Sequence, residues 1–379
     1  MMNPPGTLTT RALRADTATD ASELPVLHDV SCVIHVHSTY SDGTATVAEL
    51  ISSTAACGRD VLLLTDHDTL GARHDGWEGW HGDVLLGVGV EVSPDRGHYL
   101  AFGLDREIDH SELEEAEIPA AVRAAGGFGF AAHPFSRGSA MAARYRLTNR
   151  VGGKPHDWHG IEAEDLAGIE LWSLTTDAAE AWRSPREAIS YMRRPELALD
   201  GPPPHHLQTW DRLCARRRVS ALAGLDAHQH GFRVRGRMYS PMPNERYFGL
   251  LSTYALLREP PSGDGADDLA GVYEALREGR SYLSVDAFAD GHGFRFWGES
   301  EGASLLMGEE HSAAPCVLRV SAPQPGRIRL LRDGVEIATA DSDTLQHAIT
   351  GAGVYRAEVY LERHGAERPW IYSNPIYLR

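Results

Sequence analysis

The sequence is poor in cysteine and contains no long hydrophobic run. Only four cysteines occur among 379 residues, and no two of them are spaced as CxxC. A structural zinc knuckle or a disulfide framework is therefore not expected, and a reducing, cytoplasmic setting fits this cysteine usage best. No stretch of about 18 apolar residues is present, which argues against a transmembrane helix. The opening residues lack an apolar signal-peptide core, so we expect a flexible N-terminal arm over residues 1–25.

Positive charge is also in short supply. The formal net charge is −17 at pH 7, which argues against binding to nucleic acid or to an anionic membrane through a basic surface. A nucleotide or short oligonucleotide substrate remains compatible with this balance, because bound cations would make an active site locally positive. The expected partner is therefore a small-molecule substrate, with no role for a membrane.

The familiar motifs of covalent catalysis are missing. The chain has no GxSxG elbow, no phosphate-binding P-loop and no HExxH zinc motif. No cysteine stands beside a histidine that could activate it. A mechanism that needs no covalent side-chain nucleophile is the simpler expectation.

Histidine, in contrast, is abundant, and it gathers in a stretch that begins HVHSTYSDGT and continues to TDHDT. The chain has 19 histidines. His35 and His37 alternate with Val36, so on a β-strand both imidazoles would project from one face. Asp42 follows in a Ser-Asp-Gly turn, and His67 comes at the end of the next apolar run. Two strand ends that carry His and Asp on one rim indicate a metal site.

The surrounding pattern predicts an α/β architecture. Short apolar strands alternate with helical segments over residues 26–290, and polar residues gather at the carboxyl ends of the strands. That is where α/β barrels place their chemistry. Residues 135–220 are rich in Arg, Trp, His and Pro, and we expect an irregular insert or lid there. Residues 291–379 alternate apolar and polar side chains between turn signals, which predicts a small all-β sandwich.

Nine imidazoles and carboxylates follow or end the predicted strands. They are His35, His37, Asp42, His67, Glu91, His98, His133, Asp226 and His228. Each has an ordinary structural explanation when taken alone, since a strand-end histidine is often hydrogen-bonded and Asp42 suits a turn. Their recurrence at several strand ends favours two or three divalent ions. Mixed nitrogen and oxygen ligands suit Mn, Zn or Fe, and the sequence does not choose among them.

The motifs HVHSTYSDGT, TDHDT, GVEVSP, GHYLAFGL, AAHPF and GLDAH, in this order, resemble the polymerase and histidinol phosphatase (PHP) superfamily of metal-dependent phosphoesterases. The resemblance implies a distorted (β/α)7 barrel with a trinuclear metal centre. It also implies that the nine side chains divide into three sets, one for each ion: His35, His37, Glu91 and Asp226; Glu91, His98 and His133; and Asp42, His67 and His228.

The C-terminal SNPIY segment is similar to the end of the carbaryl-hydrolase-like branch (CehA/McbA) of the same superfamily. Members of that branch carry a β-sandwich after the barrel. This similarity leaves open whether the substrate is a phosphate ester or a carbamate.

These observations predict a phosphatase or phosphodiesterase of a small soluble phosphate ester, such as a nucleotide, that uses a metal-bridging hydroxide. Arg137, close after His133, is the candidate for holding phosphate oxygens. His206 is the candidate for protonating the leaving group, and Asp66 is a third candidate catalytic residue, next to His67. A carbamate or ester metallohydrolase is the alternative, and a non-catalytic metal-binding module is a third hypothesis.

Overall fold

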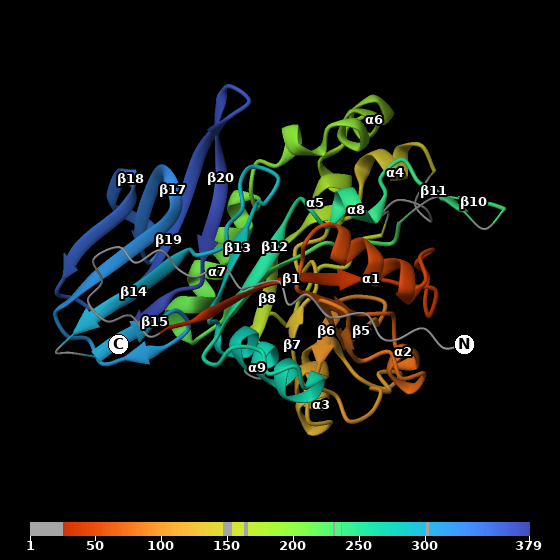
Figure 1. Ribbon diagram of the computed structural model, residues 1–379, viewed down its shortest axis with the longest axis horizontal. Helices are drawn as coiled ribbons and strands as arrows, with labels where there is room; N and C mark the ends of the chain where they lie inside the picture. The colour runs from red at the N-terminus through yellow and green to blue at the C-terminus, as the bar shows by residue number, and fades with distance from the viewer. Residues whose placement is uncertain (1–25, 147–153, 163–165, 230–231, 236, 301–302) are drawn as a thin grey trace, which may run out of the picture.

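The computed structural model describes residues 26–146, 154–162, 166–229, 232–235, 237–300 and 303–379. The N-terminal arm expected over residues 1–25 lies outside these residues. The described chain is a mixed α/β structure in which strands from both ends of the sequence share one large sheet (Figure 1). In the view of Figure 1, the labelled C-terminal strands β14, β15 and β17 to β20 lie to the left of β12, and β1 crosses the middle of the picture.

The large sheet has 14 strands, and its main path runs β15-β14-β17-β19-β20-β13-β12-β1-β2-β4-β3. Its strands from the first 290 residues are β1 (His28–Val36), β2 (Val61–Leu64), β3 (Gly79–His81), β4 (Val84–Val88), β12 (Ser252–Leu257) and β13 (Ser281–Ser284). Its C-terminal strands are β14 (Arg295–Ser300), β15 (Ala303–Leu306), β16 (Glu310–His311), β17 (Cys316–Arg332), β18 (Val335–Ile349), β19 (Gly353–Arg363), β20 (Ala366–Ser373) and β21 (Ile376–Leu378).

A second sheet of five strands runs in the order β5-β6-β7-β8-β9. Its members are β5 (Val90–Val92), β6 (Tyr99–Phe102), β7 (Phe128–Ala131), β8 (Gly168–Ser173) and β9 (Ser220–Gly224), and β10 (Phe232–Val234) pairs separately with β11 (Arg237–Tyr239). The α-helices are α1 (Val47–Ala56), α2 (Gly71–His74), α3 (Ile118–Ala124), α4 (Ala140–Arg144), α5 (Leu174–Ala181), α6 (Pro185–Arg193), α7 (Pro204–Arg216), α8 (Asn244–Tyr247) and α9 (Gly265–Glu278). Short 3-10 helices cover Glu115–Glu117 and Pro195–Ala198.

Local sequence signals explain where several of these helices begin and end. Thr46 and Glu49 form a reciprocal capping box at the start of α1, which satisfies backbone N–H groups that have no partner inside the helix. The Asp264 side chain accepts hydrogen bonds from the Ala266 and Asp267 backbone N–H groups at the start of α9, and Gly279 ends that helix in the left-handed conformation, with φ at 75°.

The two sheets meet along two seams rather than in one continuous ring of strands. An isolated parallel bridge joins His67 to Glu91 on one side, and another joins Val36 to Ala227 on the other. The described strands form no closed barrel, so the (β/α)7 barrel that the family resemblance implies is not confirmed. The α/β class is confirmed. The seams place the ends of β1, β2, β5 and β9 beside one another.

The segment 135–220 is more regular than its composition predicts. It contains β8, which lies between β7 and β9 in the five-stranded sheet, as well as the helices α4 to α7. The role of this segment as an insert or lid stays a prediction. The helices α6 and α7 have a strongly amphipathic pattern, which proline and arginine obscured in the composition.

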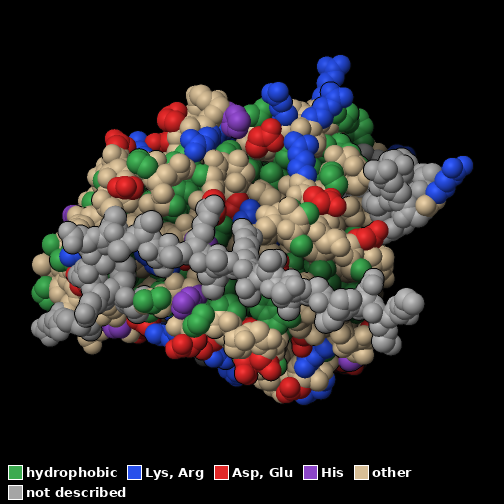
Figure 2. Space-filling view, in the orientation of Figure 1, with side chains coloured by type: hydrophobic (Ala, Val, Ile, Leu, Met, Phe, Trp, Pro, Cys, Tyr) green, Lys and Arg blue, Asp and Glu red, His purple; other side chains and the backbone are tan. Residues whose placement is uncertain are grey.

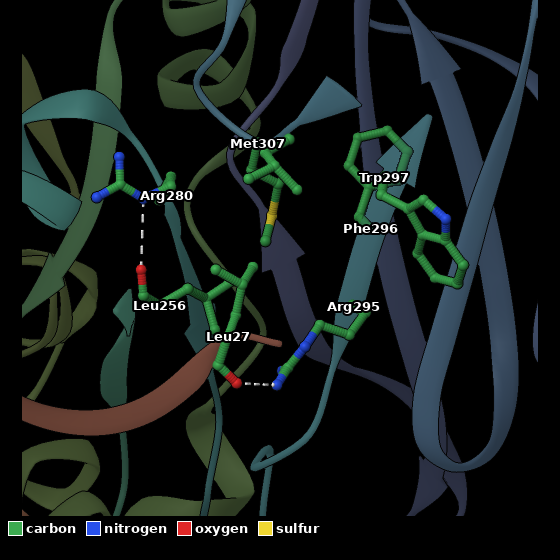
Figure 3. A pocket seen from close by; sticks show the side chains of 8 residues that line it. Leu27, Leu256, Arg280, Arg295, Phe296, Trp297 and Met307 are labelled. Atoms are coloured by element: carbon green, nitrogen blue, oxygen red, sulfur yellow. Dashed lines mark hydrogen bonds between the residues drawn. The ribbon is translucent and has the colours of Figure 1, made fainter. Parts of the chain in front are cut away.

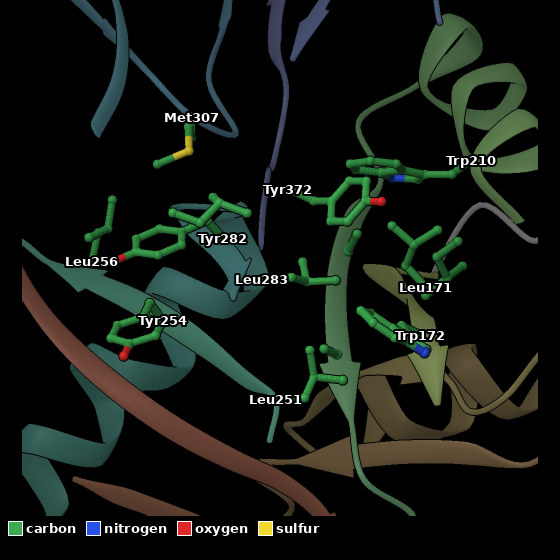
Figure 4. Close-up of a cluster of buried hydrophobic side chains, with 14 of the residues drawn as sticks. Leu171, Trp172, Trp210, Leu251, Tyr254, Leu256, Tyr282, Leu283, Met307 and Tyr372 are labelled. Atoms are coloured by element: carbon green, nitrogen blue, oxygen red, sulfur yellow. The ribbon is translucent and has the colours of Figure 1, made fainter. Parts of the chain in front are cut away.

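The C-terminal strands do not form a sheet of their own. β20 pairs with β13, with Tyr282 opposite Ser373, so the large sheet continues across residue 290. Buried side chains from both sides of that boundary form one core (Figure 4), in which the Tyr254 and Tyr282 rings stack 4.9 Å apart. The boundary between residues 290 and 291 stays a prediction.

The same junction contains a cavity of about 10 Å³, lined by Leu27, Met307 and Arg295 among others (Figure 3). Arg295 donates to the Leu27 carbonyl at 2.8 Å. This volume is about that of a single water position, and none of the nine candidate metal ligands lines the cavity. The cavity is therefore a packing feature of the junction.

None of the helices in the described part of the chain combines the length and apolar character that crossing a membrane requires. Figure 2 shows acidic and basic side chains interspersed over the visible face.

Candidate metal centre

The fold brings all nine side chains singled out in the sequence into one cluster. His35 lies on β1 and His37 directly follows that strand, Glu91 lies on β5, and the others follow strand ends or precede β6. Four overlapping groups have potential ligand atoms within 4.8 Å of one another: His37, Asp42, His67 and His228; His35, Glu91 and His133; His35, His37 and Asp226; and His67, Glu91 and His98. The structure therefore supports a shared metal-binding site.

Glu91 is the centre of the cluster. Its Oε2 lies 3.3 Å from His35 Nε2, 3.2 Å from His37 Nε2 and 3.3 Å from His67 Nδ1. Its Oε1 lies 2.9 Å from Nδ1 of His98 and 3.0 Å from Nε2 of His133. One buried carboxylate thus faces five imidazoles, which is the arrangement expected of a carboxylate that bridges metal ions.

Two further carboxylates flank this centre. Asp226 Oδ1 lies 3.6 Å from Nε2 of His35 and 3.7 Å from Nε2 of His37. Asp42 Oδ1 lies 3.1 Å from His228 Nε2 and 3.6 Å from His67 Nε2. The Asp42 side chain is 60% exposed and the His67 side chain 27% exposed, so this side of the cluster is open to solvent.

The grouping differs in detail from the one that the family resemblance implies. His98 and His133 occur in separate three-residue groups, although both contact Glu91 and their rings are 5.1 Å apart. His37 belongs to the group of Asp42 as well as to that of His35. The assignment of each side chain to a particular ion stays a prediction.

Backbone conformation contributes to this convergence in a way that simple strand alternation does not. His35 has a φ of 64°, and the pairing of β1 with β2 shifts register between Ile34 and Val36. His133 and Asp226 also have positive φ values, of 29° and 50°. Positive φ is uncommon outside glycine and concentrates at functional sites. A bulge at His35, rather than a regular strand, therefore sets the direction of its imidazole.

The electrostatics of the cluster favour bound cations. Among the described residues, His35 Nε2, both ring nitrogens of His37 and His133 Nδ1 are buried without a hydrogen-bond partner. Burial lowers the pKa of His35, but Glu170, Glu91 and Asp226 outweigh it and raise that pKa well above its usual value. Burial likewise opposes ionisation of Glu91, yet His35 and its neighbours hold the pKa of this carboxyl well below its usual range. Imidazole nitrogens and carboxylate oxygens together fit Zn, Mn or Fe.

Glu170 is a member of the site that the sequence reasoning missed. Its Oε1 accepts a hydrogen bond from His35 Nδ1 at 2.8 Å, and its Oε2 accepts one from the His133 backbone N–H at 2.6 Å. These contacts fix the side chain of one candidate ligand and the backbone of another. A Cβ on Gly224 would lie 2.0 Å from Glu170 Oε1, so glycine is required there. The signal in the sequence was a charged residue inside the apolar strand GIELWS.

His156 is a second residue that was missed. Its ring centroid lies 4.3 Å from that of His98 and 5.8 Å from that of His133. Its Nδ1 is buried and has no hydrogen-bond partner among the described residues. Burial lowers the pKa of His156 to about 4, with a further contribution from His98 and His133. No motif marked it, because it lies outside the predicted strands and their ends, in the segment between α4 and β8.

The three candidate catalytic residues occupy less central positions. Asp66 accepts hydrogen bonds from the Ser38 backbone N–H at 2.8 Å and from the Ser41 hydroxyl at 2.6 Å. Its carboxylate therefore fixes the loop between His37 and Asp42. Among the described residues, no hydrogen bond, ion pair or ring contact joins Arg137 or His206 to the nine. His206 is buried, and its ring stacks on Phe135 at 4.2 Å. Catalytic roles for Asp66, Arg137 and His206 stay predictions.

Helix α5 contacts both Asp226 and the loop that follows His133. Thr176 donates to Asp226 Oδ2 at 2.5 Å. Glu180 accepts from the Arg137 and Gly138 backbone N–H groups, both at 2.9 Å, and so fixes the loop that follows His133. Asp177 lies between these two contacts, and burial together with Glu170 and Glu180 raises its pKa well above the usual value.

Comparisons with known proteins find likeness in structure alone. No protein-family model matches the sequence, and no curated protein matches it either. A two-domain protein from Bacteroides vulgatus, described as containing a predicted PHP-like metal-dependent phosphoesterase, has 14% identity and a TM-score of 0.43, over 92% of this chain and 96% of that one. A Bifidobacterium adolescentis protein described as a metal-dependent phosphoesterase has 16% identity and a TM-score of 0.30, over 54% and 88% of the two chains.

An amidohydrolase from Chromobacterium violaceum with bound sulfate and no metal has 18% identity and a TM-score of 0.31, over 56% of this chain and 92% of that one. Two of these three proteins are described as metal-dependent phosphoesterases. None of the three descriptions points to the carbaryl-hydrolase-like branch, which is not confirmed. At these identities and TM-scores, the case for function rests on the site itself.

Proposed function

We propose that this protein is a metal-dependent hydrolase that acts on small phosphate esters as a phosphatase or phosphodiesterase. The observation that carries the proposal is the position of Glu91, a buried carboxylate within 3.3 Å of five imidazoles. A structural site needs only enough ligands to close around one ion. Nine donor side chains with one side open to solvent suit several ions and a substrate.

The residues of the cluster divide the work of binding and orientation. The candidate ligands would hold two or three divalent ions, which supply a water activated near neutral pH and positive charge for the substrate's oxygens. Glu170 accepts a hydrogen bond from His35 Nδ1, so that Nε2 of the same ring faces Glu91 and Asp226. Thr176 orients Asp226, and Asp66 holds the loop that carries Asp42. Substrate would approach from the exposed side, at Asp42 and His67.

The phosphate ester is favoured over the carbamate by charge. Although the chain as a whole carries a net charge of −17, a cluster of cations held at one open site would be locally positive, and an anionic substrate gains more from it than a neutral carbamate does. We propose that the substrate is small and soluble, a nucleotide being one example, and that the protein acts in the cytoplasm.

The proposal is tested by loading the protein with Mn or Zn and assaying p-nitrophenyl phosphate, bis-p-nitrophenyl phosphate and 1-naphthyl carbamate in parallel. We expect turnover of one or both phosphate esters. Glu91→Gln should abolish turnover and reduce the bound metal, whereas Glu278→Gln, which alters an exposed ion pair with Arg218, should change neither. Turnover of the carbamate alone would replace the phosphoesterase proposal. No turnover by protein shown to hold its ions would favour the metal-binding module.

A further inference from the structure

We propose that His156 is a substrate-contacting residue, whose imidazole hydrogen-bonds a phosphoryl oxygen held beside His98 and His133. This inference rests on the proposed function and adds to it a residue outside the nine candidate ligands. It is carried by three observations: the packing of the ring against two candidate ligands, an unsatisfied buried nitrogen, and a loop anchored to the backbone of the site.

The packing places His156 at the cluster. Its ring lies 4.3 Å from His98, which is closer than the 5.1 Å between the rings of His98 and His133. His98 and His133 are buried, whereas His156 is only partly buried. The imidazole of His156 is therefore more accessible to solvent than these two candidate ligands, against which a bound phosphoryl group could lie.

The loop that carries His156 is held in place by Trp158. The Trp158 indole N–H donates to the His98 carbonyl at 2.6 Å, and its backbone N–H donates to the Pro134 carbonyl at 2.9 Å. Trp158 is itself buried. One anchor thus ties the loop to the residue after His133 and to His98, so that the position of His156 is set relative to both.

The buried nitrogen indicates what His156 does there. An imidazole has one donor and one acceptor nitrogen when neutral, and a buried polar atom normally has a partner. His156 Nδ1 has none among the described residues. His156 is also absent from every group whose potential ligand atoms lie within 4.8 Å of one another, which favours contact with a bound ligand over metal coordination.

The test measures binding of inorganic phosphate to the metal-loaded protein by calorimetry, together with metal content. His156→Phe keeps the ring that packs on His98 and removes both nitrogens. We expect it to weaken phosphate binding about tenfold, the effect of losing one hydrogen bond to a charged group. His156→Asn, whose amide can occupy the place of Nδ1, should retain most of the affinity. Metal content should be unchanged in both variants.

The matched control is His159→Phe, in the same loop. The His159 side chain is 64% exposed and contacts Asp157 at 3.2 Å, so this variant should bind phosphate as the wild type does. If His156→Phe binds phosphate as tightly as the wild-type protein does, and the wild-type protein hydrolyses phosphate esters, this inference alone would be overturned. Loss of one ion per chain in both His156 variants would overturn it in favour of metal coordination. Wild-type protein that holds its ions but neither binds phosphate nor hydrolyses its esters would overturn the proposed function and this inference together.

Discussion

At the scale of single residues, two buried carboxylates do different work. Glu91 lies among five imidazoles and is suited to bind ions directly. Glu170 is equally buried but its two oxygens are used by His35 and the His133 backbone. It acts through those residues, as a positioning group. The distinction matters because removing a positioning group weakens metal binding without removing a ligand.

We expect Glu170→Gln to lower the affinity for metal roughly 10- to 100-fold, the usual cost of losing a group that orients a ligand. A glutamine has only one acceptor oxygen, so its NH₂ group must face either His35 Nδ1 or the His133 N–H. Metal content after dialysis against metal buffers measures the effect. Asp83→Asn, at an exposed position, is the control, and wild-type affinity in Glu170→Gln would refute the positioning role.

A substitution at Gly224 tests the contact between Glu170 and His35 by adding an atom beside it. A Cβ there would lie 2.0 Å from Glu170 Oε1 and 2.9 Å from the His35 Cβ. Gly224→Ala should therefore cost about 1–3 kcal/mol of unfolding free energy through overpacking, together with metal affinity. Urea unfolding measures the change.

Gly271→Ala is the matched control for that variant. Gly271 lies within α9, and the atom nearest to its added Cβ would be 3.9 Å away. That variant should gain up to about 1 kcal/mol, because alanine favours a helix more than glycine does. Equal effects of the two substitutions would contradict the steric explanation.

At the scale of elements, α5 links the site to the loop after β7. It carries Thr176, which bonds Asp226, and Glu180, which bonds the loop at Arg137 and Gly138. Asp177 lies between them, and its carboxyl has a pKa raised by burial and by Glu170 and Glu180. Negative charge at Asp177 therefore opposes folding.

Asp177→Asn should accordingly stabilise the protein as the pH rises. Below the ordinary aspartate pKa the carboxyl is protonated in both states, so the wild type loses nothing there. Above it the unfolded chain ionises first, and the wild type loses stability until the raised folded pKa is passed. The loss is about 1.4 kcal/mol for each unit of pKa difference.

Urea unfolding of both proteins at pH 5, 6.5 and 8 measures this difference. We expect the advantage of Asp177→Asn to grow from pH 5 upward. Asp83→Asn, at an exposed position, should show no such trend. An advantage that shrinks as the pH rises would contradict the assigned sign.

At the scale of the whole molecule, the candidate metal centre lies where the two sheets meet. The bridges from His67 to Glu91 and from Val36 to Ala227 place ligand-bearing strand ends from both sheets side by side. Ions held there would connect the sheets through side chains as well as through these few backbone contacts. Metal binding and global stability should therefore be coupled.

Chelation should lower the stability of the folded protein. At a metal concentration a hundredfold above Kd, one bound ion stabilises the native state by about 2.7 kcal/mol. We expect Tm to fall by several degrees when the ions are removed, and to return when Mn or Zn is added back. Differential scanning calorimetry with parallel metal analysis measures this. An unchanged Tm in protein shown to have lost its ions would refute the coupling.

Much of the candidate site could be predicted because its signals are local. His35 and His37 lie two apart, as do Asp226 and His228, and each pair ends or follows an apolar run. Such spacing is visible without knowing what lies next to it in space. Segment 135–220 was harder to predict, because a composition rich in proline and arginine concealed the amphipathic helices around β8.

The sequence by itself determined the nine candidate ligands and the α/β class, because strand periodicity and strand ends are properties of a few consecutive residues. Only the tertiary structure decided that Glu170 reaches His35 across 135 positions of the chain, and that His156 packs on His98. It also decided that β13 pairs with β20, so that the C-terminal strands extend the large sheet. These contacts depend on how distant segments pack, and the pattern within any one segment does not encode them.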